Sequence, residues 1–172
     1  MNEIWRRNII RIIFILSIQV LLLKRVNLTL GDFNYVHLTI YGLIIALLPY
    51  GLNRGLLIFG AFLLGLFVDL FYDSIGVHAG ASTLVAFLRY YILQFLSPRD
   101  GYKRESLTPY RYGIPWFLSF VAILTFIHLA AIYSLEAFSF VYIKEINLRT
   151  VFSFISSLFI ITVGMLIFNP KS

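Results

Sequence analysis

The residues that could carry out chemistry lie between two long apolar runs within residues 56–95. They are Asp69, Asp73, Ser74 and His78, all inside the short segment DLFYDSIGVH. A carboxylate and an imidazole in contact can exchange protons as general base and acid. Neither a serine nor a metal-ligand set of suitable spacing accompanies this pair, so we expect no catalytic site, no metal and no cofactor. Two interpretations stay open: a tight turn with satisfied polar groups, or a surface that contacts a partner.

Two antiparallel helices, predicted over residues 55–72 and 75–96, must position these side chains. With the turn centred near Asp73 and Ser74, residues whose numbers sum to about 147 lie opposite each other, which places Asp69 beside His78. Asp69 falls in the last turn of its helix, where the helix dipole is already negative, so it needs a donor. His78, the free amides that open the second helix, or a basic residue of another chain can supply one. Asp73 or Ser74 is expected to cap the second helix.

Small residues recur on both helices at a spacing of four. Ala61 and Gly65 form one pair, and Gly76 and Gly80 form another. Such pairs let helices approach closely, which is the main packing device available in lipid. The candidate structural or interaction site is therefore the hairpin formed by Gly65, Asp69, Asp73, Ser74, Gly76, His78 and Gly80.

The composition indicates that much of the protein surface faces lipid. Of the 172 residues, 60% are hydrophobic, and the mean hydropathy is +0.88. Soluble domains contain roughly 45–50% apolar residues. The absence of cysteine excludes disulfides and thiolate chemistry. The net charge of +6 is explained by basic residues in cytoplasmic loops, so we expect the lipid bilayer and no nucleic acid as a partner.

The apolar runs predict an all-α membrane protein, with residues 1–172 forming one integral domain and a compact bundle of about six transmembrane helices. The helices are expected over residues 8–23, 36–50, 55–72, 75–96, 114–135 and 149–168. With the N-terminus inside, nine basic residues fall on the inner side, namely Arg6, Arg7, Arg11, Arg54, Arg99, Lys103, Arg104, Arg111 and Lys171. Four fall outside, namely Lys24, Arg25, Lys144 and Arg149. This excess predicts cytoplasmic N- and C-termini and places the Asp69–His78 turn at the outer face.

Three further polar residues lie inside the predicted helices. Gln19 is expected to face another helix, because lipid cannot satisfy its amide. Arg89 is expected to snorkel to the inner membrane surface, and the alternative is a buried contact with a polar group on a partner helix. His128 is expected to donate one hydrogen bond to a neighbouring helix, and the alternatives are a proton relay or a ligand contact.

The segment GLFVDLFYDSIGVHAGAS (65–82) resembles the rod shape-determining protein MreD family. The likeness runs through a glycine-rich helix, Asp69, an aromatic residue, a short polar turn, and then Gly76, His78 and small residues. The segment SPRDGY (97–102) adds to it. Ile75 stands where many members of the family have a proline.

This resemblance implies a non-enzymatic membrane scaffold of the bacterial elongation (rod) complex. Such a scaffold regulates cell shape and lateral peptidoglycan synthesis from the inner (cytoplasmic) membrane, which it crosses several times. The implied partner is an MreC-like protein and, through it, MreB, RodA and a penicillin-binding transpeptidase.

The alternative is a small-molecule carrier. Six short helices, a structured first outer loop and few charges also resemble the substrate-binding subunits of energy-coupling-factor vitamin transporters, whose fold is similar in outline. A closed polar cavity near the outer face, lined by His128 or by the loop at residues 24–35, would favour this alternative. The small-residue helix faces and the lack of a catalytic set favour the scaffold.

Overall fold

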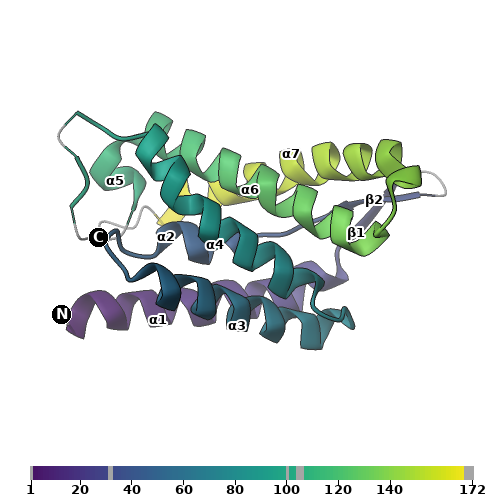
Figure 1. Ribbon diagram of the computed structural model, residues 1–172, viewed down its shortest axis with the longest axis horizontal. Coiled ribbons are helices and arrows are strands. Elements are labelled where there is room, and N and C mark those ends of the chain that lie inside the picture. Colours follow the sequence, from purple (N-terminus) through teal and green to yellow (C-terminus); the bar gives the residue numbers. More distant parts are fainter. Residues whose placement is uncertain (1, 31–32, 100, 104–106, 169–172) are drawn as a thin grey trace.

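The computed structural model describes residues 2–30, 33–99, 101–103 and 107–168, and most of them are helical (Figure 1). Within these residues, three helices are long and apolar enough to cross a membrane: α3 (Arg54–Tyr72), α6 (Ile114–Ala137) and α7 (Ile143–Phe168). The prediction of a helical membrane protein is thereby supported. Arg104 and Lys171, which entered the charge count, lie outside the described residues.

Successive helices pack side by side. α3 runs antiparallel to α4 (Val77–Phe95), α4 packs along α6, and α6 packs along α7 (Figure 1). The side chain of Asn53 opens α3 by accepting hydrogen bonds from the amides of Gly55 (2.8 Å) and Leu56 (3.3 Å), as an N-cap residue does. α6 ends at Ala137, and the residue after it, Phe138, adopts a left-handed conformation with φ 42°.

The first helical segment is continuous over three geometries: α1 (Asn2–Ser17), a π-helical turn (Ile18–Leu22) and a 3₁₀ turn (Leu23–Arg25). The predicted helix over residues 8–23 lies inside it. The helices predicted over residues 55–72, 75–96 and 114–135 match α3, α4 and α6 to within two residues at each end.

Two helix predictions need correction. α7 begins at Ile143, so the predicted start at residue 149 is too late. The helix predicted over residues 36–50 is wrong: the chain forms a strand, β2 (Phe33–His37), then an extended stretch, and then the short α2 (Gly42–Leu47). β2 pairs antiparallel with β1 (Asn27–Leu30). A further short helix, α5 (Pro109–Tyr112), was not predicted.

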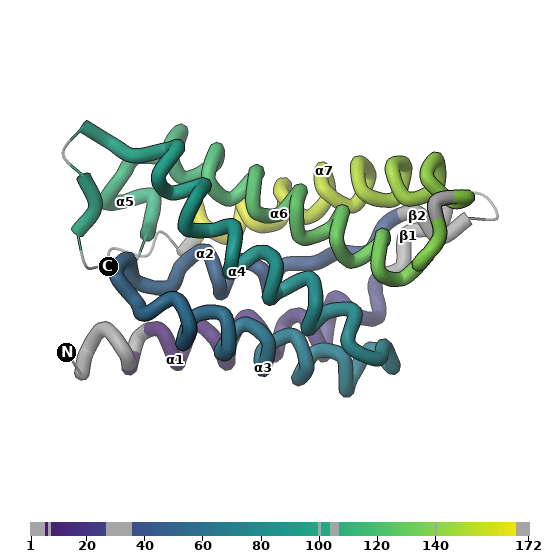
Figure 2. Tube along the Cα trace, in the orientation of Figure 1, coloured from purple at the N-terminus to yellow at the C-terminus, as the bar shows by residue number. Residues whose placement is uncertain are grey.

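The irregular stretch from Val36 to Leu47 forms the centre of the core. Of its residues, all but His37 and Gly42 are buried. Figure 2 shows the trace running from β2 to α2 between one layer made by α1 and α3 and another made by α4, α6 and α7. α1 begins and α7 ends at one end of the bundle, and the two strands lie at the opposite end (Figure 1). We call the end with the strands the strand end.

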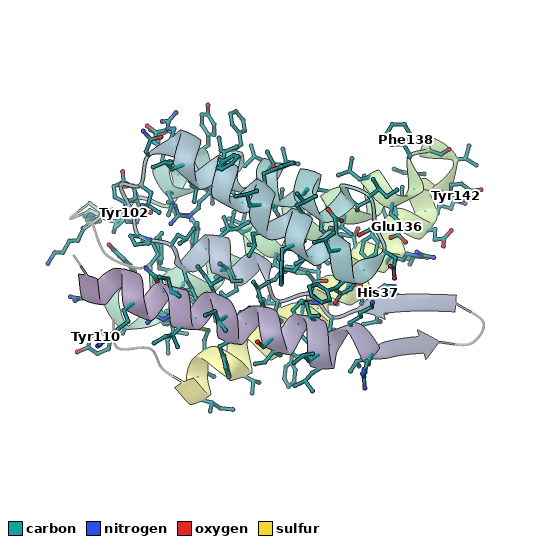
Figure 3. All side chains as sticks on the ribbon, turned by 90° about the horizontal axis from the view of Figure 1, so that it is seen from below. His37, Tyr102, Tyr110, Glu136, Phe138 and Tyr142 are labelled. Carbon is teal, nitrogen blue, oxygen red and sulfur yellow. The ribbon has the colours of Figure 1, made fainter. Side chains whose placement is uncertain are left out.

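Aromatic residues close the other end of the bundle. The Tyr102 hydroxyl donates to the carbonyl of Leu93, and the Trp116 ring nitrogen donates to that of Leu96, each at 2.8 Å. Leu93 lies in the last turn of α4 and Leu96 directly follows it, where backbone acceptors lack helical partners. Burial raises the pKa of Tyr102 to about 12. In Figure 3, Tyr102 and Tyr110 lie at this end, whereas His37, Glu136 and Tyr142 lie at the strand end.

Candidate functional site

Asp69 caps helix α4 across the hairpin. Asp69 is 4% exposed. Its Oδ1 accepts from the His78 amide and its Oδ2 from the Ala79 amide, both at 3.0 Å. These amides belong to the first turn of α4, which has no helical acceptor for them. One carboxylate of α3 thus caps the start of α4. The predicted pairing of Asp69 with His78 is confirmed, and so is one of the predicted donors, the free amides of the second helix.

Ser74 and the His78 ring complete this group. The Ser74 hydroxyl lies 2.6 Å from Asp69 Oδ1, to which it donates, and 2.9 Å from His78 Nδ1. His78 Nδ1 is also 3.0 Å from the same carboxylate oxygen. A hydrolytic triad needs the serine and the carboxylate on opposite nitrogens of the imidazole. Here both contact Nδ1, so the arrangement differs from a triad. We call Asp69, Ser74 and His78 the clamp, because their contacts hold α3 against the start of α4. Ser74 thus contacts the Asp69–His78 pair, but on the same imidazole nitrogen as Asp69.

The turn itself requires two left-handed residues, Asp73 with φ 54° and Gly76 with φ 79°. The prediction that Asp73 or Ser74 caps α4 is wrong, because the N-cap residue is Gly76, which makes no side-chain cap, and Asp69 takes that role from the preceding helix. The Asp73 side chain is 93% exposed and lies 3.9 Å from Lys24 Nζ. Lys24 also donates to the carbonyl of Phe71 and so neutralises the negative end of α3.

Gly65 is the residue that lets the two helices meet. A Cβ built there would lie 2.6 Å from Ala79 Cα and would also collide with the His78 carbonyl. The predicted close approach is therefore present at Gly65, and Ala61, the other residue of the pair, is buried. The second pair acts differently: Gly80 faces Leu135 of α6, and Gly76 serves the turn conformation rather than packing.

The hairpin is linked to the extended stretch at the centre of the bundle. The His78 ring lies between the rings of Tyr41 and Tyr72, with centroid distances of 5.8 Å and 5.0 Å. The Tyr72 hydroxyl in turn lies 2.6 Å from Gln19 Nε2. The clamp at the turn and the core segment thus share one buried polar layer.

Gln19 satisfies the backbone of that stretch. Its Nε2 donates to the carbonyl of Leu38 at 3.0 Å, and its Oε1 accepts from the amides of Ile40 (2.7 Å) and Tyr41 (3.3 Å). Gln19 is 1% exposed and lies in the π-helical turn after α1. The prediction that its amide faces another helix is confirmed for Tyr72 of α3, whereas its other partners belong to the extended stretch and not to a helix. π turns inside helices are frequent at functional positions.

Two serines of α7 also accept hydrogen bonds from backbone amides of this stretch. The Ser153 hydroxyl accepts from the amide of His37 at 3.1 Å, and the Ser157 hydroxyl accepts from that of Thr39 at 3.0 Å. Both serines are fully buried. Backbone amides in a protein interior need hydrogen-bond partners, and these serine side chains supply two of them.

Arg89 and His128 differ from their predicted roles. Arg89 is 3% exposed and donates to the carbonyl of Leu48, so the snorkelling prediction is wrong and the buried contact is present. His128 is 2% exposed, and its ring meets Tyr41 edge to face at 4.8 Å. Among the described residues its Nε2 has no hydrogen-bond partner. The hydrogen bond to a neighbouring helix that was expected of His128 is therefore not made by Nε2 within those residues.

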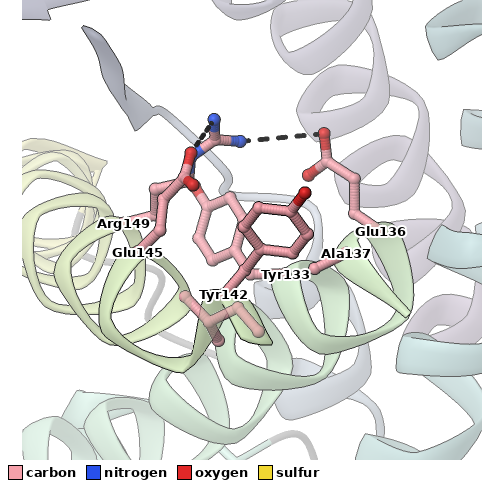
Figure 4. Close-up of a pocket in the computed structure, with 7 residues that line it drawn as sticks. Tyr133, Glu136, Ala137, Tyr142, Glu145 and Arg149 are labelled. Atoms are coloured by element: carbon pink, nitrogen blue, oxygen red, sulfur yellow. Dashed lines mark hydrogen bonds and ion pairs between the residues drawn. The ribbon is translucent and has the colours of Figure 1, made fainter. Parts of the chain in front are cut away.

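A polar pocket of about 220 Å³ opens at the strand end, between the end of α6 and the start of α7 (Figure 4). Arg149 lies 2.6 Å from Glu145 and 3.9 Å from Glu136, and Tyr133 and Tyr142 also line the pocket. It is open to the surface and is lined neither by His128 nor by residues 24–35, the lining that would have favoured a carrier.

His37 lies beside this pocket in β2. Burial lowers the pKa of its imidazole; Glu136 acts in the opposite direction by raising it, and Arg149 lowers it further. Its ring centroid is 6.4 Å from that of Tyr133, whose hydroxyl lies 2.6 Å from Ser153. The pocket is therefore connected to the central stretch through Ser153.

The sequence carried signals for several of these residues that the predictions did not use. Glu145 and Arg149 are four residues apart, the spacing of a helical ion pair, which indicates that the helix begins before residue 149. Ser153 and Ser157 share the same spacing and therefore one face of α7.

Comparisons of the chain with protein-family models, with curated proteins and with solved structures gave no match. The assignment of a function therefore depends on the geometry and on the resemblance of residues 65–82.

Proposed function

We propose that this protein is a non-enzymatic membrane scaffold that binds a transmembrane helix of a partner against the outer face of α3. In this proposal it crosses the bacterial inner membrane several times and belongs to the elongation complex, as the hairpin resemblance suggests. Its partner is an MreC-like protein, and through that protein it regulates RodA and the transpeptidase.

The observation that carries the proposal is the outer face of α3. Leu56, Leu63 and Phe67 are 70%, 47% and 44% exposed, and Gly60 lies among them at helical spacing. An added Cβ at Gly60 would meet nothing within 4 Å in the described part of the chain. A small residue in a lipid-facing apolar stripe leaves room for a second helix to approach closely.

The inner face of the same helix favours a fixed binding surface. Gly65 brings α3 against α4, and Asp69 joins the two helices through two backbone amides. A surface held in one geometry loses little conformational entropy when a partner binds. The clamp lies on the opposite side of α3 from the proposed docking face. By fixing α3 against α4, it favours a rigid docking surface.

The experiment is affinity purification of the tagged protein from gently solubilised bacterial membranes, followed by mass spectrometry. Gly60→Leu fills the notch in α3. Gly164→Leu is the matched control, because Gly164 in α7 also has nothing within 4 Å of an added Cβ among the described residues. We expect wild type and Gly164→Leu to recover an MreC-like partner, and Gly60→Leu to recover at least about tenfold less. Equal recovery with both variants, or none with wild type, would count against the proposal.

The second candidate, a substrate-binding subunit of a vitamin transporter, is favoured by one observation. The buried extended stretch, whose backbone groups hydrogen-bond to Gln19, resembles the interrupted helices that form binding sites in transporters. A small molecule that stays bound through purification and is identified by mass spectrometry would support this candidate. Its absence from a stable, monodisperse preparation would favour the scaffold.

A further inference from the structure

A second pocket lies between the first turns of α3 and the last turns of α4, at the end of the bundle opposite the strands. Its volume is about 210 Å³. Arg54, Arg89 and the ring of Tyr90 line it, together with apolar side chains that include Leu57 and Phe87. Its lining does not include Leu56, Gly60, Leu63 or Phe67, the residues of the proposed docking face.

Arg89 brings a buried positive charge to this pocket. Its side chain donates to the carbonyl of Leu48, but its Nε is buried with no hydrogen-bond partner in the described residues. A buried guanidinium is costly unless an anion and further hydrogen bonds compensate it. One carbonyl is a neutral acceptor, so it does not balance the charge of the guanidinium.

No described carboxylate fills that role. The acidic side chains that the structure describes are Asp69, Asp73, Glu136 and Glu145, and their ion-pair and hydrogen-bond partners are at the strand end. Within the described residues, the Arg89 guanidinium therefore has no anionic partner.

Arg54 adds a second cation at the mouth of the pocket. It is exposed, and its guanidinium lies 3.2 Å from the centroid of the Tyr90 ring. Stacking on an aromatic ring holds a guanidinium in place while leaving its edge donors free. One buried and one exposed guanidinium on the same pocket form a pair suited to an oxyanion with several acceptor oxygens.

We propose that this pocket binds a phosphate group, with Arg89 at its floor and Arg54 at its mouth. A phosphate offers enough oxygens for both guanidinium groups, and the apolar lining suits the carbon chain next to it when the phosphate belongs to a lipid. The two sources of the group are a phospholipid headgroup and free inorganic phosphate.

The test compares two probes on the full-length protein. In one arm, inorganic phosphate is titrated into protein in a neutral detergent by calorimetry. In the other arm, the protein is placed in phosphatidylcholine nanodiscs with and without phosphatidylglycerol, and lipids retained after extraction are measured by native mass spectrometry. Binding in the first arm alone identifies free phosphate as the source, and binding in the second alone identifies a lipid.

The variants decide whether the pocket is responsible. Arg54→Gln removes the exposed cation without touching the core, and we expect about a tenfold or greater loss of affinity for the probe that binds. Arg89→Lys keeps the charge but loses the planar fork and is expected to weaken binding as well. Arg99→Gln is the control, because Arg99 is an exposed arginine in the loop after α4 that does not line the pocket.

Binding by wild type that Arg54→Gln weakens and Arg99→Gln leaves within about twofold would support the proposal. Wild-type protein that binds neither probe would overturn it. An equal loss with Arg54→Gln and Arg99→Gln would also overturn it, because the attraction would then depend on net charge rather than on the pocket. Arg54→Gln carries the test if Arg89→Lys fails to fold.

Discussion

The contact of α3 with α4 at Gly65 gives the most direct prediction for stability. Gly65→Ala would place a methyl group 2.6 Å from Ala79 Cα, against backbone that cannot rotate away. Relief requires the helices to separate by on the order of 1 Å, since ordinary carbon contacts are about 3.5–4.0 Å. That separation stretches the Asp69 hydrogen bonds to the His78 and Ala79 amides, which are now 3.0 Å long.

The magnitude follows from three effects. Overpacking costs about 1–3 kcal/mol, and each weakened hydrogen bond to a charged group costs up to about 1.5–3 kcal/mol. Alanine recovers about 1 kcal/mol through its better helix propensity. The net loss is about 3 kcal/mol, or about 10 °C in Tm for a chain of this size.

The assay is thermal unfolding of the detergent-solubilised protein, with Gly60→Ala as the matched control in the same helix. Nothing lies within 4 Å of an added Cβ at Gly60 in the described structure, so this variant should match or slightly exceed wild-type stability. Equal Tm values for Gly65→Ala and Gly60→Ala would refute the packing of α3 on α4 described above.

Three further predictions concern the polar groups. Asp69→Ala should lower Tm more than Asp73→Ala, because Asp69 is 4% exposed and the Asp73 side chain is 93% exposed; His78→Ala should add little to Asp69→Ala, and additive losses in a double-mutant cycle would contradict the shared clamp. Gln19→Leu should lower the free energy of unfolding by about 2–4 kcal/mol, because it leaves the Leu38, Ile40 and Tyr41 backbone groups unsatisfied. Denaturant or thermal unfolding measures this loss, and the control Ser156→Ala, whose hydroxyl bond in α7 is exposed, should be nearly neutral. Burial lowers the pKa of His37 below 6.5, so on acidification the unfolded chain takes up the proton first. Stability should therefore fall as the pH drops through 6.5 toward the folded-state pKa. His37→Gln should flatten this pH dependence, and an unchanged slope would exclude His37 as its source.

The hairpin was predictable because its determinants are local. Two apolar runs joined by a short turn fix an antiparallel register, and the register alone pairs Asp69 with His78. The capping role of Asp69 was harder to predict. It depends on left-handed conformations at Asp73 and Gly76, which set where α4 begins relative to α3. Local propensity favours a cap from within the turn, and geometry across the hairpin overrides it.

The central stretch could not be predicted from its own residues. An apolar run such as residues 36–50 is compatible with a helix or a buried extended segment, and periodicity does not separate the two. The outcome is decided by side chains distant in the sequence: Gln19, Ser153 and Ser157 satisfy the amides of the extended form. The buried position of Arg89 has the same origin, because its partner is the Leu48 carbonyl just after α2.

Cross-linking in intact membranes tests the proposed docking face of α3 most directly. Because the chain contains no cysteine, Leu63→Cys places a single thiol on the outer face of α3, and Leu166→Cys places one on the exposed face of α7 as the matched control. After treatment with a thiol-reactive cross-linker, we expect the Leu63 variant to form a covalent adduct with an MreC-like or RodA-like membrane protein and the Leu166 variant to form none. An adduct only at Leu166, or none at either position, would contradict docking on α3.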